Sequence, residues 1–181
     1  MKRFLLGIDI GSGGCKVTLL DMENQIHYIQ ANEYPTYYPK PGWAEQNPDD
    51  WIEAIGTAIK SLFAKFGVSS RDIEAIGISR VTHSPVLLDK SGKVLRPVIH
   101  LTDTRSIDQV QWLRQKAGHL IQNATFNFVS AMWTLPMLLW IRENEANIWK
   151  RISKVLFPKD YIRFKLTGSY VTDRIDAAGT L

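Results

Sequence analysis

The apolar positions in the first third of the chain follow patterns typical of β-strands. Phe4–Ile10 is an apolar run, Lys16–Leu20 is rich in β-favouring residues, and residues 26–30 follow the turn-forming letters DMEN. Because only short turns separate these runs, they predict an antiparallel meander of three strands. The next segment, YPTYYPKPGWAEQ, is rich in proline and is expected to be a loop.

A helical pattern follows in the letters NPDDWIEAIGTAIKSLFAKFG. Asn47 and Pro48 suit a helix start, and Gly67 suits its end. Apolar residues recur between them at helical spacing: Trp51, Ile55, Ile59, Leu62 and Phe66. Residues 73–81 then predict a strand, and residues 86–100 predict a hairpin that turns at Ser91-Gly92.

The remaining elements alternate between helix and strand. Ser106 and Gln109 predict a capping box that opens a second helix, which Gly118 is expected to close. A third helix is expected from Thr134, followed by a strand over residues 154–157, a short helix in KDYIRFKLTG and an extended SYVTD. This order predicts an α/β domain in which helices cover a mixed sheet.

Composition narrows the class of protein. The chain has 181 residues, 45% hydrophobic and 22% charged, which is typical of a globular domain. No apolar stretch reaches the ~20 residues that span a bilayer, and the single cysteine excludes an intrachain disulfide. The net charge of +4 is scattered among acids, so neither nucleic acid nor membrane is expected as a partner. A cytoplasmic location is expected.

The glycine-rich letters GIDIGSGGCK allow several interpretations. A P-loop is excluded because Cys15 precedes Lys16 and Val17 follows it. A dinucleotide-binding turn requires a third glycine where Lys16 stands, and a helix immediately afterwards. A plain β-hairpin and a phosphate-facing turn both remain open.

Two features favour the phosphate-facing turn. Asp9 stands in an otherwise apolar strand, where an uncompensated carboxylate would be costly. Beyond it, small residues expose backbone N–H groups beside Ser12 and Lys16. A carboxylate near hydrated Mg²⁺ beside such a turn would form half of a phosphoryl-transfer site.

The same stretch resembles the first phosphate loop of the actin, Hsp70 and sugar-kinase superfamily. GWAEQNPDDW, IEAIGISRVTHSPVLLDKSGKVLRPVIHLTDTR and VLFPKDYIRFKLTGSYVTDRIDAAGT resemble collinear segments of the FGGY carbohydrate kinases, xylulokinases most of all. The resemblance implies a ribonuclease H-like (actin-like ATPase) fold. It also implies phosphorylation of a sugar hydroxyl with ATP and Mg²⁺ as cofactors.

The resemblance also implies roles for individual residues. Asp9 would lie near the Mg²⁺ of the nucleotide. The transferred phosphate would face Gly11, Ser12, Gly13 and Lys16, and the sugar would meet Thr82, His83 and Asp103. Without the resemblance, His83 would be read as an ordinary loop histidine.

The ending DRIDAAGTL has neither a tail-like composition nor a cap. Residues 1–181 are therefore expected to be the N-terminal domain of such a kinase, truncated before its end. The catalytic base and the C-terminal domain would lie beyond it, and the isolated chain would be inactive. Expected partners are a small sugar or polyol, the second domain and a further copy in a homodimer.

Some letters depart from the xylulokinase pattern. RVTHSP stands where such chains have Gly-Gln-Met-His-Gly, and Leu101-Thr102-Asp103 where they have Trp-Asn-Asp. THS and TDTRS are closer to gluconokinase-like members. Kinases for gluconate or another polyol, a non-catalytic sugar-binding module and a nucleotide-binding dehydrogenase are therefore alternatives. The dehydrogenase requires a helix directly after Gly14.

Overall fold

The computed structural model describes residues 3–21, 26–80 and 83–180. The chain forms two compact units. The first unit comprises residues 1–35 and 49–81, and the second comprises residues 36–48 and 82–181. The strands of each unit pair only within that unit, and each unit has its own buried side chains, so the units are described in turn.

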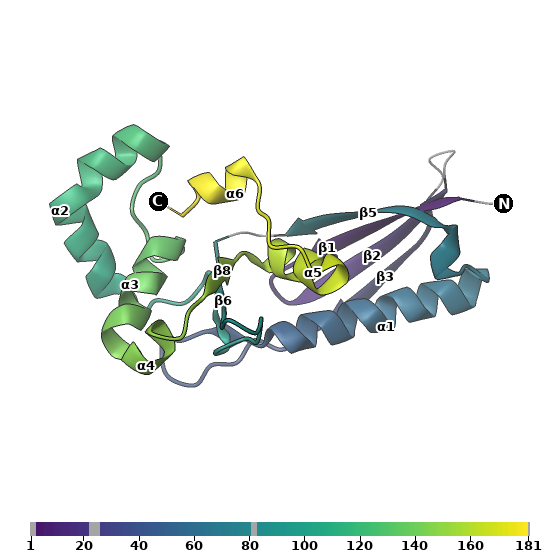
Figure 1. The fold of residues 1–181 in the computed structure, drawn as a ribbon, viewed down its shortest axis with the longest axis horizontal. Coiled ribbons are helices and arrows are strands. Elements are labelled where there is room, and N and C mark those ends of the chain that lie inside the picture. Colours follow the sequence, from purple (N-terminus) through teal and green to yellow (C-terminus); the bar gives the residue numbers. More distant parts are fainter. Residues whose placement is uncertain (1–2, 22–25, 81–82, 181) are drawn as a thin grey trace. The chain divides into compact units, whose positions relative to one another are not determined.

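The first unit is built on a four-stranded mixed sheet in the order β3-β2-β1-β5. β1 (Phe4–Ile10), β2 (Gly14–Asp21) and β3 (Ile26–Glu33) are antiparallel neighbours, and β5 (Ile73–Arg80) pairs in parallel with β1. Figure 1 shows these strands side by side. The predicted meander and the mixed sheet are both confirmed.

Helix α1 (Pro48–Phe66) runs alongside this sheet (Figure 1). Its buried stripe consists of Trp51, Ala54, Ile55, Ala58 and Leu62. Gly67, with φ of 62°, ends the helix as expected, because this left-handed conformation favours glycine. A 3₁₀ turn, η1 (Ser70–Asp72), then leads into β5, and α1 supplies the crossover that parallel pairing requires.

Strand β1 alternates between a buried and an exposed face. Phe4, Leu6, Ile8 and Ile10 are buried, whereas Gly7 and Asp9 are exposed. The carboxylate of Asp9 therefore needs no internal partner, and the expectation of a costly buried charge is wrong. The sequence hides this alternation because Leu5, on the same face as Asp9, is also apolar.

The second unit contains two small antiparallel ladders. β4 (Glu45–Gln46) pairs with β7 (Val98–Ile99), and β6 (Val86–Leu88) pairs with β8 (Lys154–Leu156). The predicted turn forms, with Gly92 N donating to Asp89 O at 3.0 Å. Around the turn, Leu88 forms an antiparallel bridge with Val94 and Leu95 N donates to Leu87 O at 2.9 Å, so the predicted hairpin is confirmed near its turn. Because β7 pairs with β4, the ladder does not extend to a pairing of β6 with β7. Pro97, which lacks an N–H, cannot extend a ladder between them.

The helices of the second unit are α2 (Ile107–Thr125), α3 (Thr134–Asn144), α4 (Ala146–Trp149), α5 (Pro158–Thr167) and α6 (Arg174–Ala178). Met137 and Ile141 of α3 pack with Leu87 and Ile99 in one buried cluster. A second cluster holds Val110, Leu113, Ile121 and Val129. None of the helices in the described part of the chain is long and apolar enough to cross a membrane.

The predicted start of α2 after Ser106 is confirmed, but the predicted capping box and the predicted end are wrong. The Ser106 side chain makes no capping hydrogen bond, and the amide of Gln109 instead donates to Glu143 at 2.6 Å. The helix passes through Gly118 and ends at Thr125, followed by Phe126 with a φ of 60°. An interior glycine costs only about 1 kcal/mol, and burial of Ile121 in the following turn offsets it.

Candidate functional site

The glycine-rich stretch is a hairpin turn between β1 and β2. Ile10 pairs with Cys15 and Asp9 pairs with Lys16. Across the tip, Gly11 N donates to Gly14 O at 2.8 Å. A strand follows Gly14, which excludes the dinucleotide-binding turn because that turn opens a helix.

Tyr34 holds this turn from the end of β3. Its backbone N donates to Gly13 O at 3.1 Å, and its hydroxyl donates to Gly11 O at 2.5 Å. Burial raises the pKa of Tyr34 to about 12, so the hydroxyl keeps its proton and remains a donor at neutral pH. This contact could not be predicted from the sequence, because Tyr34 lies among several loop tyrosines.

The glycines of the turn serve different purposes. None of them has a left-handed φ, so backbone conformation does not require glycine here. A Cβ on Gly14 would lie 2.7 Å from Asn32 O, so lack of space at β3 requires this glycine. A Cβ on Gly13 would meet nothing within 4 Å. The backbone at Gly13 is therefore open to the approach of a ligand.

The five residues predicted in this stretch share one open cavity of about 650 Å³. Its lining includes Asp9, Gly11, Ser12, Gly13 and Lys16, together with Gly14, Cys15, Ala31, Asn32 and Glu33. Asp9, Ser12 and Lys16 are exposed, whereas Cys15 is buried. A carboxylate, an ammonium group and open backbone around one hollow can accommodate a phosphate group with its cation.

The metal-binding capacity of this cavity is limited. Among the described residues, no three His, Cys, Asp or Glu side chains form a group that could hold a metal ion. Mg²⁺ commonly keeps several waters and takes one or two carboxylates plus substrate phosphates. The exposed carboxylates of Asp9 and Glu33 at this cavity fit that mode of binding and do not fit a metal cage built from protein side chains.

Arg80, which was not among the predicted site residues, ends β5 opposite Ile10 of β1. Its guanidinium carbon lies 4.0 Å from the ring centroid of Trp51, and the residue is 9% exposed. Burial lowers the pKa of Arg80 to about 10. The only indication of Arg80 in the sequence is its position at the end of an apolar run.

The predicted sugar-binding residues belong to the second unit. Thr82 lies outside the described residues. His83 is half-buried, with a φ of 80°. The hydroxyl of Thr134 donates to its carbonyl at 2.7 Å, and the Trp133 ring centroid lies 4.2 Å from that of the imidazole. Burial lowers the pKa of His83, while the Asp176 carboxylate and a hydrogen bond to the Gly179 backbone raise it.

Asp103 is only 2% exposed and is bonded to other protein groups. Its Oδ2 accepts from the Ala44 amide at 2.6 Å and from Arg105 Nη2 at 2.8 Å, and its Oδ1 accepts from Arg105 Nε at 2.9 Å. Arg105 also bonds Glu45 at 2.8 Å and lies over the ring of Trp43 at 3.7 Å. The GWAEQ and TDTR motifs thus form one buried ionic and aromatic cluster.

A second charged cluster links α5 to α6. Lys159 Nζ lies 2.7 Å from carboxylate oxygens of Asp160, Asp173 and Asp176. Burial acts to lower the pKa of Lys159, but these three hydrogen bonds outweigh it and raise the pKa. Asp173 also caps α6 by accepting from the amides of Ile175 and Asp176.

Comparison with known proteins agrees with this architecture. The family model "FGGY family of carbohydrate kinases, N-terminal domain" matches residues 4–181. A xylulose kinase of Bacillus subtilis is 36% identical over 179 residues, which are 99% of this chain and 36% of that protein. The chain therefore spans about 36% of the length of this curated relative.

Solved structures give the same result. The xyloylose kinase from Brucella ovis has a TM-score of 0.93 at 40% identity and covers 98% of this chain, which matches 37% of that protein. The gluconate kinase from Lactobacillus acidophilus has a TM-score of 0.92 at 28% identity, over 99% of this chain and 36% of that one. By sequence and by fold, the chain belongs to the FGGY family of carbohydrate kinases.

Proposed function

We propose that the protein to which this chain contributes transfers a phosphoryl group from ATP, bound with Mg²⁺, to a hydroxyl of a sugar or polyol. The observation that carries the proposal is the position of Asp9 and Lys16. They face each other across the β1–β2 hairpin, beside the open backbone of Gly13. Phosphoryl transfer depends mainly on positioning and on neutralising charge, which these groups can supply.

Each residue of the turn has a defined part in this proposal. Lys16 neutralises charge on the transferred phosphate, and the amides near Ser12 and Gly13 bind its oxygens. Asp9 orients water molecules on the Mg²⁺, which would neutralise the phosphates when bound. In the second unit, His83 forms a hydrogen bond with a substrate hydroxyl.

Asp103 has a supporting part in this proposal. Its contacts with Arg105 and Ala44 favour a role in positioning the loop over direct sugar binding. The catalytic base beyond this chain, a second domain, a homodimer and the cytoplasmic location remain predictions.

We take a ketopentose such as xylulose as the first substrate candidate, because four of the similar curated proteins are named xylulose kinases. Gluconate is the second candidate, because one structural relative is a gluconate kinase and the THS and TDTRS letters favour it. A sugar-binding module without catalysis is the alternative outside the enzymes.

The test is coupled ADP release by the full-length gene product with D-xylulose, D-gluconate or glycerol. We expect one of these to stimulate release, and Lys16→Gln to reduce the rate. Lys60→Gln is the matched control, since Lys60 is exposed on α1 of the same unit. If a sugar binds but no polyol stimulates ADP release, the binding module replaces the kinase.

A further inference from the structure

One face of the sheet beside the β1–β2 turn is exposed. Asp9 pairs with Lys16 and Lys16 pairs with Ala31, so these three side chains lie on the same face. All three are exposed, and they line the cavity of about 650 Å³. The charged side chains of the cavity therefore belong to the exposed face.

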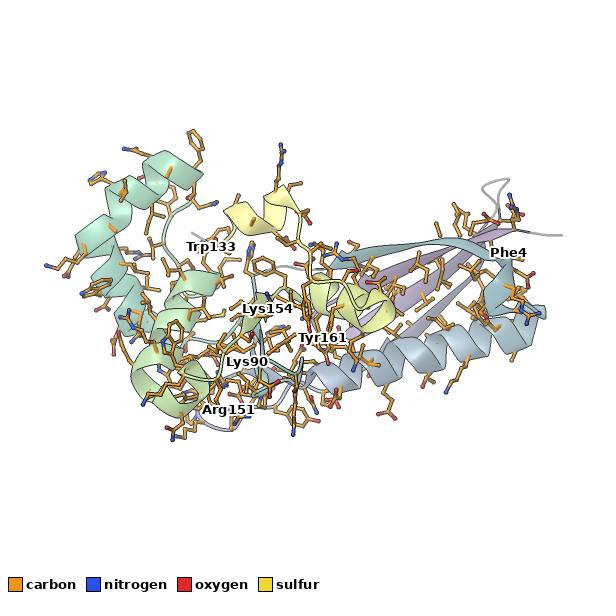
Figure 2. All side chains as sticks on the ribbon, in the orientation of Figure 1. Phe4, Lys90, Trp133, Arg151, Lys154 and Tyr161 are labelled. Carbon is orange, nitrogen blue, oxygen red and sulfur yellow. The ribbon has the colours of Figure 1, made fainter. Side chains whose placement is uncertain are left out.

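The opposite face is covered by α1. Cys15 pairs with Asn32, and Tyr34 follows Asn32 at the two-residue period of an extended chain. The side-chain amide of Asn32 donates to Ala54 O of α1 at 3.2 Å, which identifies this as the face that the helix covers. Phe4, labelled in Figure 2 at the other end of β1, is buried on the same face.

Tyr34 holds the turn from the covered face at two points. Its hydroxyl donates to Gly11 O at 2.5 Å, and its backbone N donates to Gly13 O at 3.1 Å. The residue is only 6% exposed, so the ring that carries the hydroxyl is itself held in place by packing. Two carbonyls of the turn are thus fixed by one residue.

The bond to Gly11 O also fixes the direction of an amide. The peptide bond between Gly11 and Ser12 is trans, so its N–H points away from its C=O. Because Gly11 O points toward the buried Tyr34 hydroxyl, the Ser12 N–H points away from that hydroxyl, toward the exposed side of the turn. At the neighbouring Gly13 a Cβ would meet nothing within 4 Å, so an anion has room to approach.

We propose that Tyr34 is a positioning residue for phosphoryl transfer, which holds the Gly11 carbonyl on the covered face so that the Ser12 amide donates to the γ-phosphate of ATP. The phosphate in this statement rests on the proposed function, whereas the direction of the amide rests on the fold. Tyr34 is not among the residues that line the cavity, so it acts through the backbone of the turn. A donor that is already oriented needs no reorganisation when charge develops on the phosphate.

The first test compares nucleotides with and without the phosphate that is transferred. Full-length wild type and Tyr34→Phe are titrated by calorimetry with the Mg²⁺ complexes of ADP and of AMP-PNP, a non-hydrolysable analogue of ATP. Tyr34→Phe removes the hydroxyl that holds Gly11 O. We expect the affinity for AMP-PNP to fall roughly tenfold, the scale of one hydrogen bond to a charged group, and that for ADP to change less than about twofold. Equal losses for both nucleotides, or no loss for either, would overturn the positioning role.

Tyr28→Phe is the matched control. Tyr28 lies toward the other end of β3, where its hydroxyl donates to Gln30 Oε1 at 2.7 Å. This variant therefore loses a tyrosine hydrogen bond in the same strand without altering the turn, and its affinity for both nucleotides should equal that of wild type. A loss of AMP-PNP affinity as large as that of Tyr34→Phe would assign the effect to a loosened sheet and contradict the proposal.

Hydrogen exchange in the full-length wild type tests the amide without any variant. AMP-PNP with Mg²⁺ should slow exchange at the Ser12 amide, and MgADP should not. A Ser12 amide that AMP-PNP leaves unprotected overturns the proposal, including the case in which Tyr34→Phe fails to fold.

Lys16→Gln separates this inference from the proposed function. If Lys16→Gln weakens AMP-PNP binding and Tyr34→Phe does not, the phosphate site stands and the positioning role fails. If neither variant weakens it, the turn does not bind the transferred phosphate, and the proposed function loses its main support. In coupled ADP release, Tyr34→Phe should lower kcat and leave the KM for the sugar unchanged, whereas a general loosening of the protein would change both.

Discussion

Arg105 binds both carboxylate oxygens of Asp103, with Nε 2.9 Å from Oδ1 and Nη2 2.8 Å from Oδ2. Both side chains are 1% exposed. Removing one partner of a buried ion pair leaves the other charge uncompensated. We therefore expect Asp103→Ala to lower the free energy of unfolding by about 3–5 kcal/mol, measured by urea denaturation.

Asp108→Ala provides the comparison for this variant, because Asp108 is exposed in the first turn of α2. Asp108→Ala should lower the free energy of unfolding by less than about 1 kcal/mol, which is the usual contribution of a charge near a helix end. Equal losses for the two variants would show that the buried pair contributes nothing special. A stable Asp103→Ala chain that no longer binds sugar would instead favour direct contact of Asp103 with the substrate.

The glycines of the hairpin should respond differently to alanine. Gly14→Ala places a Cβ 2.7 Å from Asn32 O, so we expect a loss of about 1–3 kcal/mol from overpacking. Gly13→Ala has open space and should change stability by less than about 0.5 kcal/mol. Thermal or urea unfolding of the two variants measures the difference, and a larger loss for Gly13→Ala would contradict the described turn.

Lys16 should affect phosphate binding without affecting the fold. Its side chain is exposed, so Lys16→Gln should leave the free energy of unfolding nearly unchanged. Loss of a hydrogen bond to a charged group should weaken nucleotide binding by the full-length protein roughly 10- to 100-fold, measured by calorimetry with MgATP. Binding equal to that of Lys60→Gln would remove Lys16 from the site.

Helix α6 should detach in acid. The hydrogen bond from Lys159 lowers the pKa of Asp173 from its ordinary value of 3.8 to about 2, so this carboxylate binds its proton less readily in the folded chain. A lowered pKa contributes stability that is present above the unfolded value and is lost as the pH falls toward about 2. The backbone amides of Ile175 and Asp176 should therefore lose protection from hydrogen exchange as the pH falls from 3.8 toward about 2.

Asp173→Ser separates the two roles of this residue. Serine keeps a capping acceptor but has no charge for Lys159 and does not titrate in acid. In this variant we expect faster exchange in α6 at neutral pH and a weaker dependence on acid. An unaltered acid transition would assign it to other carboxylates, such as Asp160 or Asp176.

Local patterns predicted the first unit well. The three runs of the meander, α1 with its Gly67 end and the strand at residue 73 are all present, because each depends on neighbouring residues alone. The predictions failed where contacts between residues distant in the sequence determine the secondary structure. β7 pairs with the distant β4, Gly118 remains helical because Ile121 is buried beyond it, and α6 depends on Lys159.

The candidate site shows the same limit. The hairpin could be predicted because the strands that carry Asp9 and Lys16 follow each other in the chain with only a short turn between them. The partners of His83 could not, because Trp133 and Gly179 reach it only through the fold. No sequence pattern distinguishes a glycine required for space from one that ends a helix, so Gly179 gave no usable signal.

The contact between Gly179 and the His83 ring has a consequence for biosynthesis. Gly179 follows His83 by 96 residues, and a ribosome adding about 5–20 residues per second needs roughly 5–20 s to cover that interval. During this time the hairpin, α1 and β5 have already been synthesised, while the His83 imidazole still lacks its contact with Gly179. The hairpin turn between β1 and β2 can therefore form co-translationally, and His83 reaches its final setting only late in synthesis.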